Sequence, residues 1–260
     1  MNPSSLHNIQ TDQDDTYKEI FNQRGQCYHN AMTQFPEARN QEFELLIDKL
    51  NLSDGDKLID IPSGGGYLHN YLDKDIELHS VDEAKQFITT DKLNNKYCCD
   101  TCHTPFNDNT FDKAYSLAGS HHMPDKSAFY NEVHRILKPG GIFAYADVAE
   151  NSPADRFLNI FVNEYNSMGH QGEFLNINRT SDALTSCNFT IANAYLCQYQ
   201  WAFSSQTRAA NFFKNLFGLD LATNKDIING IDKYLNPTSN KNSFYVDWQL
   251  LHFKCVGLEI

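Results

Sequence analysis

The chain has 260 residues and a formal net charge of −12 at pH 7. This acidic balance argues against a broad phosphate-binding face, so we expect no nucleic-acid partner. Hydrophobic residues make up 41% of the chain and aromatic residues 13%, which is typical of a folded protein and excludes a disordered one.

The first residues are polar and lack the apolar core of a secretory signal. No run approaches the ~20 apolar residues that are needed to span a bilayer. The seven cysteines are an odd number without regular spacing, which favours a reducing setting. We therefore expect a cytoplasmic protein that acts on a small molecule and has no membrane partner.

The first half of the chain alternates apolar strands with helical patterns. Helices are expected at 14–32, 37–50 and 126–137, and strands at 57–61, 76–81, 96–100, 111–116 and 142–148. The stretch Lys138-Pro139-Gly140-Gly141 is a strong helix stop. Strands and helices that alternate at this spacing predict a parallel sheet with helices on both faces.

Beyond residue 150 the pattern changes. Helices are expected at 155–168, 181–187, 209–219 and 224–235, and long strands at 189–203 and 244–256. Because the last helical pair lies between two strands, it is interpreted as an insertion over the sheet. We expect one domain, 1–260, with an N-terminal helical lid (14–50), a cofactor-binding core (51–150) and a helical cap insertion (204–240).

A glycine-rich turn follows the first strand, in the order Asp60-Ile61-Pro62-Ser63-Gly64-Gly65-Gly66. Glycines let the chain turn sharply and let a ligand approach the backbone. The amides of the next helix would then point into the crevice above the strand ends. This turn alone is a weak signal, because many nucleotide-binding proteins and ordinary turns share it.

Four blocks carry a more specific resemblance: residues 58–68, Val81-Asp82, 100–116 and 134–141. Together they resemble the class I S-adenosylmethionine-dependent methyltransferases, small-molecule branch (type 11-like). The resemblance implies a doubly wound, Rossmann-like α/β fold with a mostly parallel seven-stranded sheet and an antiparallel last strand. It also implies an enzyme that transfers a methyl group from S-adenosyl-L-methionine to oxygen, nitrogen or carbon of a small acceptor.

Family positions imply the residues that hold this cofactor. Asp82 would accept the ribose hydroxyls, with Glu83 as its reserve, although Asp82 could instead cap the next helix. Asp100 and Thr101 would face the adenine. The amino-acid tail of the cofactor would be held by Asp60, Pro62, Ser63, Gly64, Gly65 and Gly66. The sulfonium would be lined by Ser116, Leu117 and Ala118.

The sequence departs from the family at Pro62, where the first glycine of the loop usually stands. A proline lacks the amide and has its φ restricted, so a loop that no longer binds is the alternative. Pro62 also keeps a second alternative open, a catalytically inactive S-adenosylmethionine-binding or scaffold protein. The dinucleotide reading is weaker, because the third glycine of that motif would fall on Tyr67 or His69.

Two histidines, His121 and His122, follow the fourth strand, where the family has a loop that faces the methyl group. Either could act as a base or orient the acceptor, or both could pack locally and cap the helix at Lys126. The cysteine-rich stretch 98–103 contains a C-x-x-C-H pattern that also occurs in haem and zinc sites. Because its strand end is assigned to the adenine, we expect no metal.

Aromatic residues outside the core are candidates for covering the site. Tyr17, Tyr28 and His29 could close over the cofactor, or the helix that carries them could simply pack on the domain. Trp201 and Phe203 could face an apolar acceptor, or form the core of the cap.

Overall fold

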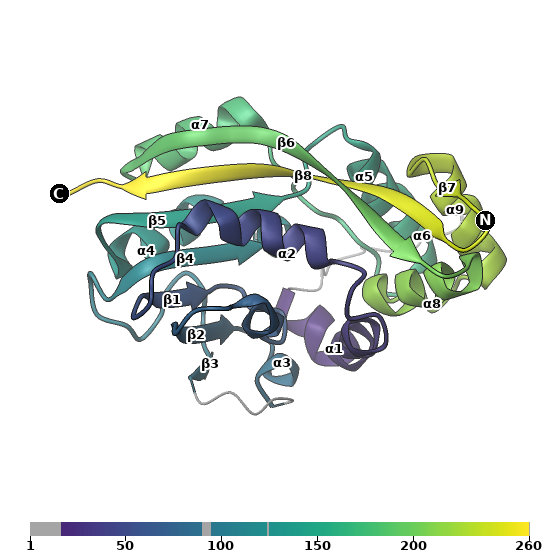
Figure 1. Ribbon diagram of the computed structural model, residues 1–260, viewed down its shortest axis with the longest axis horizontal. Coiled ribbons are helices and arrows are strands. Elements are labelled where there is room, and N and C mark those ends of the chain that lie inside the picture. Colours follow the sequence, from purple (N-terminus) through teal and green to yellow (C-terminus); the bar gives the residue numbers. More distant parts are fainter. Residues whose placement is uncertain (1–16, 90–94, 124, 260) are drawn as a thin grey trace, which may run out of the picture.

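A computed structural model of the chain describes residues 17–89, 95–123 and 125–259. Within these ranges a sheet of eight strands runs through the molecule, with helices on both faces (Figure 1). The strands are β1 (Lys57–Asp60), β2 (Glu77–Asp82), β3 (Lys96–Cys98), β4 (Phe111–Leu117), β5 (Leu137–Asp147), β6 (Phe189–Phe203), β7 (Thr238–Ser239) and β8 (Phe244–Gly257). The helices are α1 (Tyr17–Gln34), α2 (Asn40–Ile47), α3 (Lys85–Thr89), α4 (Lys126–Ile136), α5 (Pro153–Arg156), α6 (Asn163–Tyr165), α7 (Ile177–Ser186), α8 (Gln206–Phe217) and α9 (Asn224–Tyr234). Residues 14–16 of the predicted lid lie outside the described residues.

The strand order is β3-β2-β1-β4-β5-β8-β6, and the two-residue β7 pairs with the outer part of β8. Strands β1 to β5 pair with one another in parallel, whereas β8 runs antiparallel to both β5 and β6. This arrangement confirms the predicted α/β fold with an antiparallel last strand.

The central strands β1, β4 and β5 have buried residues on both faces of the sheet, whereas many residues of β6 are exposed. Neighbouring residues of one strand serve opposite faces: Leu58 belongs to one buried cluster and Ile59 to the other. In β5, Ala144 and Phe143 divide in the same way. The small alanine side leaves room for α2, and the large aromatic side packs against α4.

Strand β5 begins earlier than the sequence predicts, at Leu137 instead of residue 142. Leu137 already pairs with Phe111, and the register between β4 and β5 then shifts before Lys113 pairs with Ile142. The Lys-Pro-Gly-Gly stretch therefore forms an irregularity inside the strand. Gly140 has a φ of +76°, a conformation that favours glycine.

The helix predicted at 155–168 is divided into three parts. A short α5 continues into a π-helical segment, Phe157–Val162, and then into α6. Insertions of this kind often occur near functional sites. Here the segment brings Leu158 to a cavity described below.

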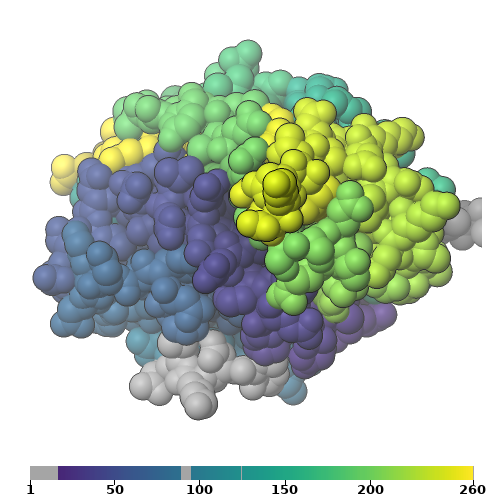
Figure 2. Space-filling view, turned by 45° about the vertical axis from the view of Figure 1, so that its right-hand side comes forward, coloured from purple at the N-terminus to yellow at the C-terminus, as the bar shows by residue number. Residues whose placement is uncertain are grey.

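Helices α8 and α9 lie between β6 and β8 in the chain, at the end of the molecule where these two strands extend beyond the rest of the sheet (Figure 1). In the space-filling view, atoms of α1 lie against those of α8 (Figure 2). These two helices close the carboxyl end of the sheet from one side. Among the described residues, every helix is too short or too polar to cross a membrane.

Candidate active site

The carboxyl ends of four adjacent strands meet beneath α1. Asp60 ends β1, Asp82 ends β2, Leu117 ends β4 and Asp147 ends β5. In open α/β sheets, ligands bind in the crevice outside these ends. Two adjoining cavities open here.

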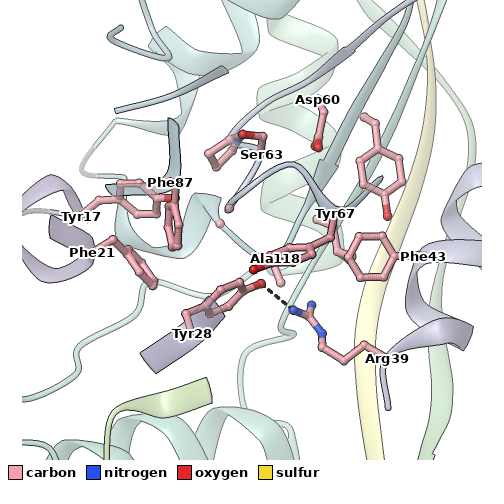
Figure 3. A pocket seen from close by; sticks show the side chains of 15 residues that line it. Tyr17, Phe21, Tyr28, Arg39, Phe43, Asp60, Ser63, Tyr67, Phe87 and Ala118 are labelled. Atoms are coloured by element: carbon pink, nitrogen blue, oxygen red, sulfur yellow. Dashed lines mark hydrogen bonds between the residues drawn. The ribbon is translucent and has the colours of Figure 1, made fainter. Parts of the chain in front are cut away.

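The first cavity has a volume of about 470 Å³ and lies over the glycine-rich loop (Figure 3). Several predicted residues line it together: Tyr17, Tyr28, Asp60, Pro62, Ser63, Gly64, Leu117 and Ala118. The sequence analysis did not identify the others: Phe21, Arg39, Phe43, Tyr67, Phe87, Tyr115 and Gly119.

Buried polar groups of this cavity have no partner within the described chain. The Ser63 and Tyr115 hydroxyls line the cavity, and the Ser116 hydroxyl lies in the same strand as Tyr115; none of the three has a hydrogen-bond partner among the described residues. Burial raises the pKa of Asp60 well above its usual value, and Asp82 raises it further against the opposing charge of Lys96. Unpaired buried polar groups cost free energy, so this cradle suits a ligand that carries charge and hydrogen-bonding groups.

Arg39 supplies a positive charge to the same wall. Its Nη1 donates to the Tyr28 hydroxyl at 2.8 Å, a bond drawn in Figure 3, and its Nη2 donates to Glu42 Oε2 at 2.7 Å. Burial alone would lower the pKa of Arg39, but Glu42 and Tyr28 raise it above its usual range. The guanidinium is therefore charged, with Nε and Nη2 bound to Glu42 and Nη1 bound to Tyr28 at the cavity wall.

The loop accommodates Pro62 by a close approach to Gly119. A Cβ on Gly119 would lie 2.4 Å from Pro62 Cγ, so only glycine fits there. The Ser63 amide donates to Val81 O at 2.8 Å, and Gly65 has a φ of +104°. The loop thus keeps an ordered turn with proline in its first position.

The predicted ribose and adenine residues lie beside the first cavity, outside the set that lines it. Asp82 is buried, and its carboxylate accepts from the Tyr17 hydroxyl and from the Gly64 and Ala84 amides, each at 2.9 Å. The Asp82 carboxylate thus joins α1 to the glycine-rich loop and to Ala84, the residue before α3. Burial, which outweighs these hydrogen bonds, raises its pKa to about 6.

Glu83 and Asp100 have partners of their own. Glu83 Oε1 accepts from the Thr101 amide and hydroxyl at 3.1 and 2.8 Å. Asp100 accepts from the Cys102 amide at 2.7 Å and lies 3.0 Å from His103 Nδ1. The roles predicted for these residues toward ribose and adenine stay predictions.

The second cavity, of about 550 Å³, adjoins the first. Both cavities are lined by Phe21, Tyr28, Arg39 and Ala118. The rest of the second cavity is largely apolar, with histidines on one side: Arg24, His121, His122, Val148, Leu158, His170, Trp201, Leu216, Phe217 and Trp248.

The predicted pair His121 and His122 therefore lies at the second cavity. His121 Nδ1 lies 2.8 Å from Asp147 Oδ1, and Asp147 Oδ2 accepts from the Ser120 hydroxyl at 2.7 Å. Burial alone would raise the pKa of Asp147, but His121, Ser120 and the Val148 amide hold it below its usual value. Because Asp147 is ionised, it accepts from His121 Nδ1, and Nε2 is the His121 nitrogen left for another partner.

The predicted lid and cap residues are placed as follows. Tyr28 lines both cavities, and Trp201 lines the second. His29 Nδ1 lies 2.6 Å from the Tyr67 hydroxyl and so holds α1 on the loop. Phe203 packs on Phe212, with ring centroids 5.2 Å apart, and lies outside the residues that line the two cavities.

Sequence reasoning missed Arg39, Asp147 and His170. Asp147 ends a strand, as Asp60 does, so strand-end position could have identified it. Arg39 stands three residues before Glu42, a spacing that indicates an ion pair but no cavity. His170 lies in an irregular segment after α6, and no pattern in the sequence marks it.

Comparison with known proteins identifies a common domain. Residues 59–145 match the family model described as a methyltransferase domain. Methyltransferase GfsG of Streptomyces halstedii is 26% identical over 131 residues, which are 46% of this chain and 47% of that protein. The 24-methylenesterol C-methyltransferase 2 of Arabidopsis thaliana is 27% identical over 135 residues, 46% of this chain and 37% of that protein. The chain thus spans about half or less of these curated relatives.

A solved structure shares the fold over nearly the whole chain. The [4+2]-cyclase SpnF superimposes with a TM-score of 0.63 at 14% identity, covering 94% of this chain and 97% of that one. At this identity the match concerns the fold alone.

Proposed function

From the class I S-adenosylmethionine-dependent methyltransferase domain that the chain carries, we propose that it transfers a methyl group to a small molecule held in the second cavity. The observation that carries this proposal is the junction of the two cavities at Ala118, Tyr28, Phe21 and Arg39. A donor in the first cavity and an acceptor in the second would meet there without a water-filled gap. Such positioning supplies much of the acceleration of an in-line displacement.

The first cavity suits the amino-acid tail of S-adenosyl-L-methionine. When bound, this cofactor supplies a methyl group on a positively charged sulfur, which becomes a neutral thioether as the methyl group leaves. Asp60 would meet the tail ammonium, and Arg39 with Tyr28 would meet the tail carboxylate. The unpaired Ser63 and Tyr115 hydroxyls offer further hydrogen bonds. We assign the ribose to Asp82, whose carboxylate would have to exchange the Tyr17 hydroxyl for the sugar.

The second cavity favours an apolar acceptor with at least one polar group. Trp201, Trp248, Phe217 and Leu158 supply its apolar walls, and the histidines supply the polar side. Relatives named as sterol C-methyltransferases are consistent with an acceptor of this kind. For an oxygen or nitrogen acceptor, we propose that His121 or His122 orients the group or takes up its proton.

We also propose a cytoplasmic location and no nucleic-acid partner. Support comes from the cysteines, all of which are free, and from the net charge of −12.

Calorimetric titration of S-adenosyl-L-methionine, S-adenosylhomocysteine and NAD into the protein tests the cofactor. We expect micromolar binding of both sulfur nucleosides and none of NAD. Asp60→Asn should weaken that binding by about tenfold or more, whereas Glu44→Gln, an exposed carboxylate on α2, should leave it unchanged. Absence of binding would refute the proposal.

Transfer itself is tested with a tritiated methyl donor and a panel of apolar alcohols, amines and alkenes. Turnover of one class would identify the acceptor atom. Cofactor binding without turnover of any acceptor would favour the inactive binding protein.

A further inference from the structure

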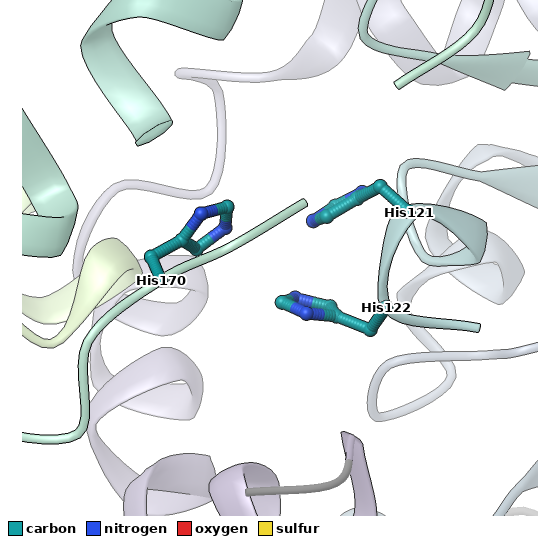
Figure 4. Close-up of side chains that lie close together, drawn as sticks. All are labelled: His121, His122 and His170. Atoms are coloured by element: carbon teal, nitrogen blue, oxygen red, sulfur yellow. The ribbon is translucent and has the colours of Figure 1, made fainter. Parts of the chain in front are cut away.

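Three histidines converge at the second cavity (Figure 4). His121 and His122 come from the turn after β4, and His170 comes from the segment after α6. Their candidate ligand nitrogens all lie within 4.8 Å of one another. Ring centroids are 4.1 Å apart for His121 and His122, and 5.2 Å apart for His122 and His170.

Two of these rings are oriented by acceptors behind them. His121 donates from Nδ1 to the ionised Asp147, as described above. His170 Nδ1 lies 3.2 Å from Asn159 Oδ1, which also accepts from the Gly172 amide at 2.7 Å and is therefore the acceptor of this pair. In both rings Nδ1 is thus engaged, and Nε2 is the nitrogen left for another partner. Histidines that bind metals are held in this way, with the second nitrogen donating to a carboxylate or carbonyl oxygen.

Charged groups of both signs lie around the cluster. Two cations, Arg24 and Lys126, face the cluster and oppose a further positive charge. Asp147 supplies a negative charge directly behind His121, and Glu173 lies 3.9 Å from Lys126.

We propose that His121, His122 and His170 together bind one divalent transition-metal ion, zinc in the first instance, with its fourth position open to the second cavity. Three protein ligands and one open position are the composition of catalytic zinc sites. Nitrogens around a tetrahedral zinc lie roughly 3.4 Å apart, so nitrogens that lie within 4.8 Å of one another have to approach by at most roughly 1.4 Å. Side-chain rotation supplies such a movement.

The consequence for catalysis rests on the proposed function. A hydroxyl acceptor bound at the open position would release its proton to solvent more readily, because the metal stabilises the oxygen anion. An oxygen lone pair would then form the bond to the methyl carbon while the carbon–sulfur bond breaks. The role predicted for His121 or His122 as a base would pass to the metal.

Metal binding is tested on the full chain without any acceptor. The protein is stripped with a chelator, dialysed and titrated with zinc chloride, and the bound metal is counted by mass spectrometry. We expect one zinc per chain, and cobalt(II) should give a visible spectrum typical of tetrahedral nitrogen coordination. His170→Gln should weaken zinc binding by about 100-fold, and Asp147→Asn by about 10- to 100-fold.

Two variants distinguish this site from other ligands. His134→Gln changes a histidine on α4 whose ring lies against Leu258 O, and Cys102→Ser changes the cysteine-rich stretch; both should keep one zinc. No stoichiometric zinc in the wild type would overturn the proposal, as would unchanged affinity in His170→Gln. Titration of S-adenosylhomocysteine into the same samples separates the two hypotheses. A protein that binds S-adenosylhomocysteine but no zinc refutes only the metal site. A protein that binds zinc but no S-adenosylhomocysteine refutes only the proposed function.

Discussion

Glu42 joins the walls of both cavities and is the most informative residue to change. It is fully buried, with 0% of its surface exposed. Its Oε2 accepts from Arg39 Nε at 3.1 Å and from Arg39 Nη2 at 2.7 Å, and its Oε1 accepts from Trp201 Nε1 at 2.5 Å. One carboxylate therefore links α2, the preceding turn and β6.

Glu42→Gln keeps the shape of the side chain and removes its charge. The Arg39 guanidinium would remain buried with neutral partners only, the Tyr28 hydroxyl and the new amide oxygen. Breaking a buried ion pair from one side typically costs about 3–5 kcal/mol. Because Tyr28 and the amide oxygen still accept from Arg39, we expect a loss near the lower end, about 3 kcal/mol of unfolding free energy.

Urea unfolding at pH 7, followed by fluorescence and by circular dichroism, measures this loss. Glu44→Gln changes an exposed carboxylate of the same helix and should stay within about 0.5 kcal/mol of the wild type. The double variant Arg39→Met/Glu42→Gln removes both charges and should regain about 1–3 kcal/mol relative to Glu42→Gln.

The ion-pair reasoning would be refuted by a loss below about 1 kcal/mol in Glu42→Gln, or by a double variant no more stable than the single one. The double variant should also lose most affinity for S-adenosyl-L-methionine although it folds. Retained affinity would remove Arg39 from the cofactor site.

Three further outcomes are expected. Burial raises the pKa of Asp82 to about 6, so its proton stabilises the folded state below that pH and this contribution is lost as the pH rises through 6. From pH 7 to pH 5 the wild type should gain about 1 kcal/mol relative to Asp82→Asn in urea unfolding, and an equal pH response would contradict this. Gly119→Ala places a Cβ 2.4 Å from Pro62 Cγ, so it should lower the free energy of unfolding by about 1–3 kcal/mol and weaken cofactor binding. The control Gly257→Ala, whose Cβ has its nearest contact at 3.7 Å, should have neither effect. Equal effects of the two substitutions would be inconsistent with the clash. Tyr17→Phe removes the hydrogen bond to Asp82 and should speed amide hydrogen exchange in the first turns of α1, and unchanged exchange would mean that other contacts hold the lid.

Local pattern was sufficient for most of the fold. The strand predicted at 189–203 has the observed bounds of β6, because strand alternation is a property of neighbouring residues. The mostly parallel sheet with an antiparallel last strand followed from the resemblance. The early start of β5 was missed, since Lys-Pro-Gly-Gly stops a helix equally well whether a loop or an irregular strand follows.

The chain by itself determined the glycine-rich turn after Asp60 and the position of Tyr28 on a helix, since strand ends and helix faces can be read from nearby positions. Only the tertiary structure brought Arg39, His170 and Trp248 to the same pair of cavities. It also showed that Asp82 already binds Tyr17, a residue 65 positions away in the chain. These contacts join segments whose local sequences do not indicate that they meet, because burial and hydrogen bonding act between neighbours in space.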